Sequence, residues 1–152
     1  MLKSLGVKFN RRITVLRQFR RPAAAWLFLR IFSFAVIAPW LMYLRAPKLT
    51  QLLTPRYSPR AADPAQVEQI LAGMDAVMHV GRPLVQVRCL TRGLTLYYFL
   101  RRAGLVVELW FGVSKTAERF GAHCWLVKDG EPFGEKVDPR SIFTPVYHLP
   151  TE

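Results

Sequence analysis

The sequence predicts an α+β domain, with helices packed on a small antiparallel sheet and an apolar helical segment before them. Apolar residues recur at helical spacing over residues 64–78 and again over 89–104. Short β-rich runs follow at 106–111, 122–127 and 133–137. Because the helices precede the strands and do not alternate with them, we expect the α+β class.

The first of these helices has recognisable ends. Asp63 followed by Pro64 is typical of a helix N-cap with proline in the first helical position. Gly81 and Pro83 end the pattern. The residues at helical spacing between them are Val67, Ile70, Leu71, Met74, Val77 and Met78.

The run VQVRCLTRGLTLYYFLRRAGL predicts a second helix that starts near Cys89 and ends at Gly104. One of its stripes is polar and another is entirely small or apolar, so we expect the second stripe to face inward. The polar stripe is Arg88, Thr91, Arg92, Thr95 and Arg102; the inward stripe is Cys89, Gly93, Leu96, Leu100 and Ala103.

The charges divide the chain into two parts. Of the 22 Lys and Arg, twelve lie in residues 1–60, which contain none of the ten Asp and Glu. Residues 61–152 hold ten of each sign. With the proline-rich connection at 45–64, this predicts a basic, apolar helical appendage (1–60) and a folded domain (61–152). We expect the basic segment to bring the protein to its partner or to a membrane, and residues 61–152 to carry the activity. A chain that starts at Ala61 should then stay active at high substrate concentration.

The apolar stretch at 23–44 is long enough to cross a bilayer, and a basic segment precedes it. Arg30 within it, Pro39 and the basic residues after it argue against a span. A signal peptide fits less well, because the run is long and no cleavage site follows. We expect apolar helices that pack on the domain or on a partner, with optional contact to the inner face of the membrane. Because the basic residues precede a long apolar stretch, we do not expect them to bind nucleic acid.

The two cysteines, Cys89 and Cys124, are too few for a disulfide framework, which favours a reducing cytoplasm. Cys89 lies at a helix start, where a thiol is easily ionised, and His123 lies on a predicted strand 34 residues later. This pattern predicts a cysteine nucleophile with a histidine base. The backbone N–H of Cys89 is the expected oxyanion donor, and Gln86 is a weak candidate for the second donor.

A histidine base needs an acid to orient it. A turn at Asp129-Gly130 would place residues 135–137 opposite His123, which favours Glu135, with Asp138 as the alternative. Cys124 should point to the other face and pack in the core, although a disulfide to Cys89 that quenches the site is an alternative.

The other two histidines lack the neighbours that a catalytic or metal-binding histidine needs. His79 and His148 have no acidic or thiol neighbours in sequence and are expected on the surface or in loops. One Cys-His pair lacks the paired spacing of a metal site, so neither a metal nor a cofactor is expected.

The segments RCLTRGLTLYYFLRRAG, LWFGV and GAHCWLVKDGEP, followed by Glu135 and Asp138, resemble the B-type leader peptidases of lasso-peptide biosynthesis. Those proteins belong to the transglutaminase-like superfamily and have a papain-like Cys, His, Asp arrangement. The resemblance covers about residues 64–148. It implies that Cys89 is the nucleophile and His123 the base, whereas the family's usual Asp is replaced by Glu135.

The resemblance further implies a leader peptide as substrate, a separate small leader-binding protein as partner, and an ATP-dependent macrolactam synthetase as the next enzyme. Two alternatives stay open. An acyltransferase or amidase would use the same acyl-enzyme with an amine in place of water. A non-catalytic, membrane-associated scaffold would keep Cys89 and His123 as core residues that lie far apart.

Overall fold

A computed structural model describes residues 22–41, 43, 46–54, 61–81, 84–85, 88–116 and 119–150. Within these residues the helices are α2 (Pro22–Leu41), α3 (Ala46–Leu53), α4 (Pro64–Val80) and α5 (Cys89–Arg102). The strands are β1 (Glu108–Thr116), β2 (Arg119–Lys128), β3 (Glu131–Phe133) and β4 (Thr144–Leu149), and a 3-10 turn η1 (Pro139–Ser141) precedes β4.

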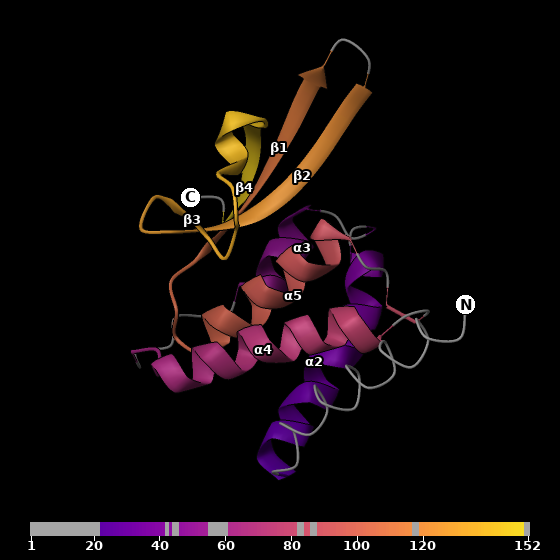
Figure 1. Cartoon of the computed structure of the whole chain (residues 1–152), viewed down its shortest axis with the longest axis vertical. Coiled ribbons are helices and arrows are strands. Elements are labelled where there is room, and N and C mark those ends of the chain that lie inside the picture. Colours follow the sequence, from indigo (N-terminus) through magenta and orange to yellow (C-terminus); the bar gives the residue numbers. More distant parts are fainter. Residues whose placement is uncertain are drawn as a thin grey trace, which may run out of the picture.

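The helices and the sheet form separate layers, as the sequence predicts (Figure 1). The sheet is antiparallel with strand order β3-β2-β1-β4. Helix α5 packs on β1 and β2 on one side and on α2 and α4 on the other. The predicted α+β class, with helices on a small antiparallel sheet, is confirmed.

The start of α4 is the predicted one. The Asp63 side chain accepts a hydrogen bond of 3.0 Å from the Ala65 backbone N–H, and Pro64 occupies the first turn. The helix ends at Val80, and the Gly81 N–H donates to the carbonyl of Val77. Its inner face carries Ile70, Gly73, Met74, Ala76 and Val77.

Helix α5 is buried on both of its long sides, because it lies between the sheet and the other helices. Thr91 and Thr95, from the stripe that looks polar in sequence, are 1% and 0% exposed. The Thr95 hydroxyl donates to the Thr91 carbonyl at 2.6 Å, so its hydrogen-bonding capacity is used inside the helix. Leu94, Leu96 and Leu100 fill the core around it.

The hairpin after β2 turns at the predicted Asp129-Gly130 pair, and both residues have positive φ, 52° and 81°. The returning strand is shorter than predicted: pairing stops at Phe133 opposite Leu126, and Gly134 takes a positive φ. The expected pairing of residues 135–137 with His123 is therefore wrong. Strand β4, which the sequence analysis missed, pairs with β1 on the opposite edge.

Helix α2 contributes directly to the core. Ile31, Ala35 and Ala38 are fully buried against α4 and α5, and Leu53 of α3 joins the same cluster. The Thr54 hydroxyl and the Tyr97 hydroxyl are 2.8 Å apart, which links the end of α3 to α5. The core thus runs across residue 60, where composition and charge change.

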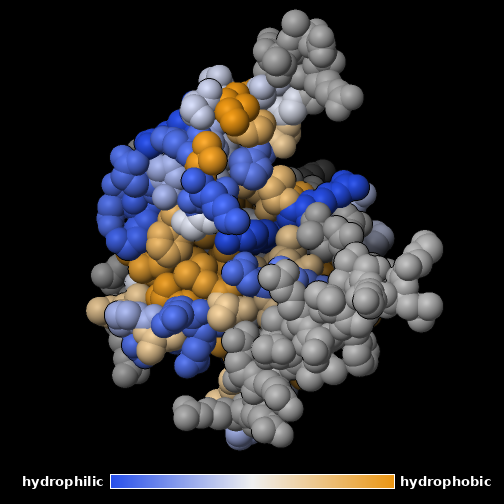
Figure 2. All heavy atoms as spheres, in the orientation of Figure 1, coloured by the Kyte–Doolittle hydropathy of each residue, from blue (hydrophilic) through white to orange (hydrophobic). Residues whose placement is uncertain are grey.

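Large hydrophobic side chains are also exposed. Figure 2 shows hydrophobic residues gathered over part of the helical half and again at the top, over the sheet. Val106, Ile142 and Val146 are each at least 60% exposed. Such patches on a small domain indicate surfaces that contact something else.

Candidate functional site

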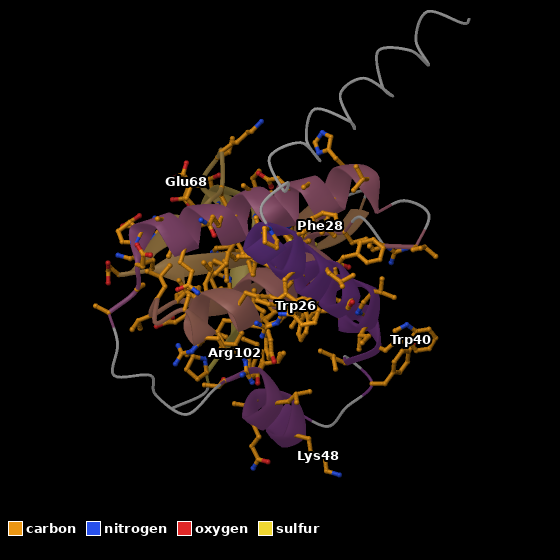
Figure 3. All side chains as sticks on the ribbon, turned by 90° about the horizontal axis from the view of Figure 1, so that it is seen from below. Trp26, Phe28, Trp40, Lys48, Glu68 and Arg102 are labelled. Atoms are coloured by element: carbon orange, nitrogen blue, oxygen red, sulfur yellow. The ribbon has the colours of Figure 1, made fainter. Side chains whose placement is uncertain are left out.

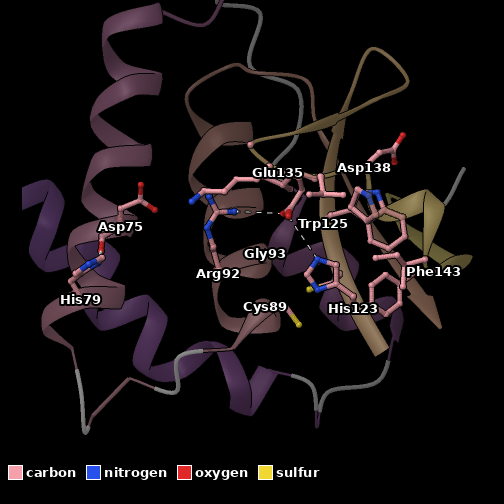
Figure 4. A pocket seen from close by; sticks show the side chains of 17 residues that line it. Asp75, His79, Cys89, Arg92, Gly93, His123, Trp125, Glu135, Asp138 and Phe143 are labelled. Atoms are coloured by element: carbon pink, nitrogen blue, oxygen red, sulfur yellow. Dashed lines mark hydrogen bonds and ion pairs between the residues drawn. The ribbon is translucent and has the colours of Figure 1, made fainter. Parts of the chain in front are cut away.

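A pocket of about 740 Å³ opens between α4, the start of α5, β2 and the segment that follows β3 (Figure 4). It is lined by the four residues that the sequence predicts as nucleophile, base and orienting acid: Cys89, His123, Glu135 and Asp138. Its apolar wall includes Trp125, Val137, Ile142 and Phe143. A pocket of this size, with a few converging polar groups, is large enough for several residues of a peptide.

Cys89 is the first residue of α5 and is half-buried. Arg88, the N-cap residue, makes no side-chain cap hydrogen bond. The N–H groups of the first turn are therefore not satisfied by a cap, and the positive end of the helix dipole acts on the thiol. A helix start without a Ser or Asp cap favours an anion at Cys89.

Contacts around the thiol lower the pKa of Cys89 to about 5. The largest cause is the hydrogen bond from the Cys124 thiol. The backbone N–H of Cys124 and the His123 ring act in the same direction, and partial burial opposes them. The contact with Cys89 and burial raise the pKa of Cys124. Cys89 is therefore the thiolate of the pair and Cys124 its donor.

Local geometry explains how the two sulfurs meet. Cys124 and His123 alternate across the sheet, as expected, and Cys124 packs toward α5. A Cβ on Gly93, one turn after Cys89, would lie 3.0 Å from the Cys124 Sγ and 3.0 Å from Leu109 Cδ1. Glycine at this position lets α5 lie close to β2, where Cys89 interacts with both Cys124 and His123.

His123 lies between the thiol and an acid. Its Nε2 is 3.8 Å from Glu135 Oε2, an electrostatic contact that is longer than a hydrogen bond. With Nε2 directed at the carboxylate, Nδ1 is the ring nitrogen left to serve Cys89. The ring is stacked on Trp125, with centroids 6.0 Å apart, and lies 5.2 Å from Phe143. These aromatic walls fix the plane of the imidazole.

Glu135 reaches His123 from the turn after Gly134, and not from a paired strand. On its other side, Glu135 Oε1 is 3.9 Å from an Arg92 guanidinium nitrogen. Arg92 lies three residues after Cys89, so the two side chains share a face of α5. From the sequence alone Arg92 belongs to the polar stripe of this helix and has no predicted role in the site, although its spacing from Cys89 indicates that the two are neighbours. Arg92 holds the acid beside the histidine.

Asp138 has a different role. Its carboxylate caps η1 through the Arg140 N–H and accepts from the Arg140 guanidinium at 2.8–3.0 Å. These hydrogen bonds hold the pKa of Asp138 below its usual value. In Figure 4 the carboxylate points away from His123. Of the two acids, Glu135 is the one that lies beside His123.

The two other histidines lie on a helix and on a strand. His79 lies on the last turn of α4 at the pocket edge, with Nδ1 3.2 Å from the Asp75 carbonyl. His148 is not in a loop: it lies on β4, half-buried, with its ring 5.8 Å from that of Trp110. Gln86 lies outside the described residues. No cluster of three metal-ligating side chains occurs among the described residues.

The contact between the two thiols gives a testable prediction. Cys124→Ala removes the S–H donor, so the pKa of Cys89 should rise from about 5 toward the ordinary value of about 8.5. The thiolate is the deprotonated form, so alkylation of Cys89 by iodoacetamide at about pH 6.5 should slow by at least about tenfold and recover above about pH 9. Mass spectrometry of the labelled peptides, taken across a pH series, measures this rate at each cysteine.

Cys124→Ser is the matched control, because it keeps a donor hydroxyl and should keep the acidic profile of Cys89. In the wild-type protein Cys124 should stay unlabelled throughout the acidic range. Identical pH profiles for the wild-type and Cys124→Ala proteins would contradict the assignment.

A thiolate at a helix start, a histidine on the adjacent strand and an acid behind it define the cysteine–histidine class of acyl-transfer site. The chain matches the transglutaminase-like superfamily over residues 28–148, and it belongs to that superfamily. Its members are usually enzymes and include cysteine proteases and acyltransferases. No curated protein and no solved structure matches the chain.

Proposed function

We propose that this chain is a cysteine peptidase that removes the leader from a lasso-peptide precursor. The observation that carries the peptidase proposal is the position of Cys89 at the start of α5, in one pocket with His123 and Glu135, where the surrounding contacts lower the pKa of its thiol. The choice of substrate rests on the resemblance of three segments, around Cys89, Trp110 and His123, to the B-type leader peptidases.

The reaction follows from the positions of the two side chains. The Cys89 thiolate attacks the scissile carbonyl carbon, and the protonated His123 gives its proton to the amine as the C–N bond breaks. Water then attacks the thioester, His123 takes a proton from it, and the thiolate returns as the new carboxylic acid leaves. The N–H of Cys89 is the available oxyanion donor.

The edge of β2 beside the pocket suits an extended peptide. Strand β3 pairs only with residues 126–128, so no described strand covers the edge at Ala122 and Cys124. In a two-residue hairpin the pair that closes the turn is hydrogen-bonded, so even-numbered residues of β2 direct their backbone groups to this edge. The Ala122 N–H and C=O are thus free to pair with a substrate strand next to His123.

Glu135→Gln should slow turnover by about 10²- to 10⁴-fold with little change in melting temperature, because an amide no longer stabilises the imidazolium. Asp138→Asn is the comparison, since its carboxylate serves Arg140 and η1. It should change turnover by less than about threefold. Steady-state cleavage rates and thermal melts of both variants test this, and the reverse ranking would move the orienting role to Asp138.

The leader-peptidase proposal is tested by supplying the chain with a lasso precursor, a leader-binding protein and an ATP-dependent macrolactam synthetase. Mass spectrometry should find the leader and core separated in the wild-type reaction only, with the Cys89→Ala protein as control. Intact precursor after long incubation with all partners present would overturn the proposal.

The acyltransferase alternative shares every step up to the thioester. A competing primary amine in the same reaction separates the two outcomes: hydrolysis leaves a free carboxylate on the released leader, and transfer leaves an amide of the amine. A peptidase should give the free carboxylate even when the amine is in large excess.

A further inference from the structure

Helix α2 has two apolar faces, and only one of them is used inside the protein. Ile31, Ala35 and Ala38 are fully buried against α4 and α5. The opposite face carries the exposed residues Trp26, Leu29, Arg30, Ser33, Ile37 and Trp40, which fall within one side of the helix at 100° per residue. Trp26 is 63% exposed and Trp40 is 68% exposed.

This outer face is unusual for a helix that covers a domain in water. Such helices normally place charged and polar side chains on the solvent side. Here the exposed face presents four large apolar residues, with Arg30 and Ser33 as its polar members. Figure 3 shows α2 in front of the other helices, with Trp40 projecting at one end. The helix is long and apolar enough to cross a membrane by length and composition.

Cations border the apolar face. A shallow groove of about 340 Å³ runs between α2 and α5, lined by Trp26, Phe34 and Tyr98 among others. The Arg30 guanidinium lies 5.8 Å from the centre of the Phe99 ring, and that of Arg102 lies 4.3 Å from the centre of Tyr98. In Figure 3 Arg102 and Trp26 lie on the same side of α2. These guanidinium groups lie beside an apolar surface, where anionic headgroups would meet them.

The sequence around α2 has the same character. Residues 1–60 carry twelve Lys and Arg and no Asp or Glu. Exposed aromatic side chains stand at both ends of the helix, with Trp26 near the start, Trp40 near the end and Tyr43, 85% exposed, just beyond. Aromatic and cationic residues around an apolar face are the composition of a bilayer interface. A cationic segment without acids is complementary to anionic lipid.

The packing of α2 on α4 and α5 determines how the helix can contact lipid. If α2 crossed a bilayer, its inner face would leave α4 and α5, and the core would lose Ile31, Ala35 and Ala38. With the domain intact, only the outer face can meet lipid, so the helix lies along the surface.

We propose that the outer face of α2 docks the folded protein on the surface of an anionic lipid bilayer, with the helix in the plane of the interface. Trp26, Leu29, Ile37 and Trp40 enter the headgroup region, and Arg30 and Arg102 contact lipid phosphates. Cys89 lies nine residues before Tyr98 on α5, about 13 Å along the helix axis. No residue of α2 lines the pocket, so a docked α2 leaves the pocket accessible to a peptide from solution.

The test uses the full chain and flotation with vesicles. The protein should float with vesicles of phosphatidylglycerol and phosphatidylcholine, and bind pure phosphatidylcholine at least about tenfold more weakly. The double variant Trp26→Ser, Trp40→Ser should reduce binding to the anionic vesicles by at least about tenfold. The matched control is Val106→Ser, Val146→Ser, which removes exposed apolar side chains elsewhere and should bind as the wild type does.

Three results would overturn the proposal: equal binding to neutral vesicles, unchanged binding of the double tryptophan variant, and retention on the vesicles through an alkaline carbonate wash, which marks a spanning helix. Failure of the wild type to float would also overturn it and would leave α2 as a contact for a partner protein. The Cys89→Ala protein should float normally, so docking is tested independently of the peptidase proposal.

Discussion

Replacing Cys89 with alanine is expected to lower turnover by about 10⁴- to 10⁶-fold, because no other described thiol lies at an open helix start beside a histidine. The side chain is half-buried and packs at the margin of the core cluster, so the variant should fold. Cleavage assays at saturating substrate, with a thermal melt of the same sample, measure both effects.

Cys124→Ser is the control for this change. It keeps a donor to Cys89 and removes the second thiol, so turnover near neutral pH should stay within about tenfold of the wild type. Equal loss of activity in folded samples of both variants would mean that the two cysteines act as one unit, and would contradict the assignment of Cys89 alone as nucleophile.

Removing residues 1–60 is expected to abolish cooperative folding. The truncation deletes Ile31, Ala35, Ala38, Leu41 and Leu53 from the core. Each large buried side chain contributes about 1.5–3 kcal/mol, and a domain has only about 5–15 kcal/mol in total. The charge distribution alone suggests a chain from Ala61 that still works at high substrate concentration, whereas the packing predicts one that does not fold.

Two point variants of the full chain separate the faces of α2. Ile31→Ala, at a position with no exposure, should reduce the free energy of unfolding by about 2–5 kcal/mol. Trp40→Ser, on the outer face, should change it by less than about 0.5 kcal/mol. Denaturant titrations measure both. A truncated chain that melts cooperatively at the temperature of the full chain would show that α2 is an appendage.

Much of the site can be read from local sequence. The Asp63-Pro64 start of α4, the Asp129-Gly130 turn and the helix that begins at Cys89 depend on short-range rules of capping and turn geometry. Once the helix that starts at Cys89 and the strand that carries His123 are predicted, packing the helix on the strand brings this thiol and this imidazole together. The α+β class follows from the order of the same elements.

Long-range contacts were harder to predict. Glu135 lies beside His123, but for a reason other than strand pairing: the strand ends at Phe133, and Arg92 on α5 supplies the cation that holds the acid. Neither the close approach at Gly93 nor the contact between the two thiols is encoded in neighbouring residues. Both depend on how α5 lies against β2.

The sequence does not reveal which face of α2 is buried. Apart from Arg30 and Ser33 the helix is apolar, so periodicity does not distinguish a core helix, a membrane span and an interfacial helix. The decision requires knowing that α4 and α5 present complementary apolar faces to Ile31 and Ala35. Strand β4 was missed because most of its residues are exposed and Pro145 interrupts its pattern.

The most direct test of the account is the fate of an acyl group on Cys89. The protein is mixed with the activated ester p-nitrophenyl acetate at about pH 6, quenched in acid and mapped by mass spectrometry, in parallel with a His123→Ala variant. In the wild type a single acetyl group should form quickly on Cys89 and then be lost by hydrolysis. In the variant it should persist, because no imidazole activates water. Acetylation of Cys124, or the same rate of loss from both proteins, would contradict the claim that Cys89 and His123 form one catalytic pair.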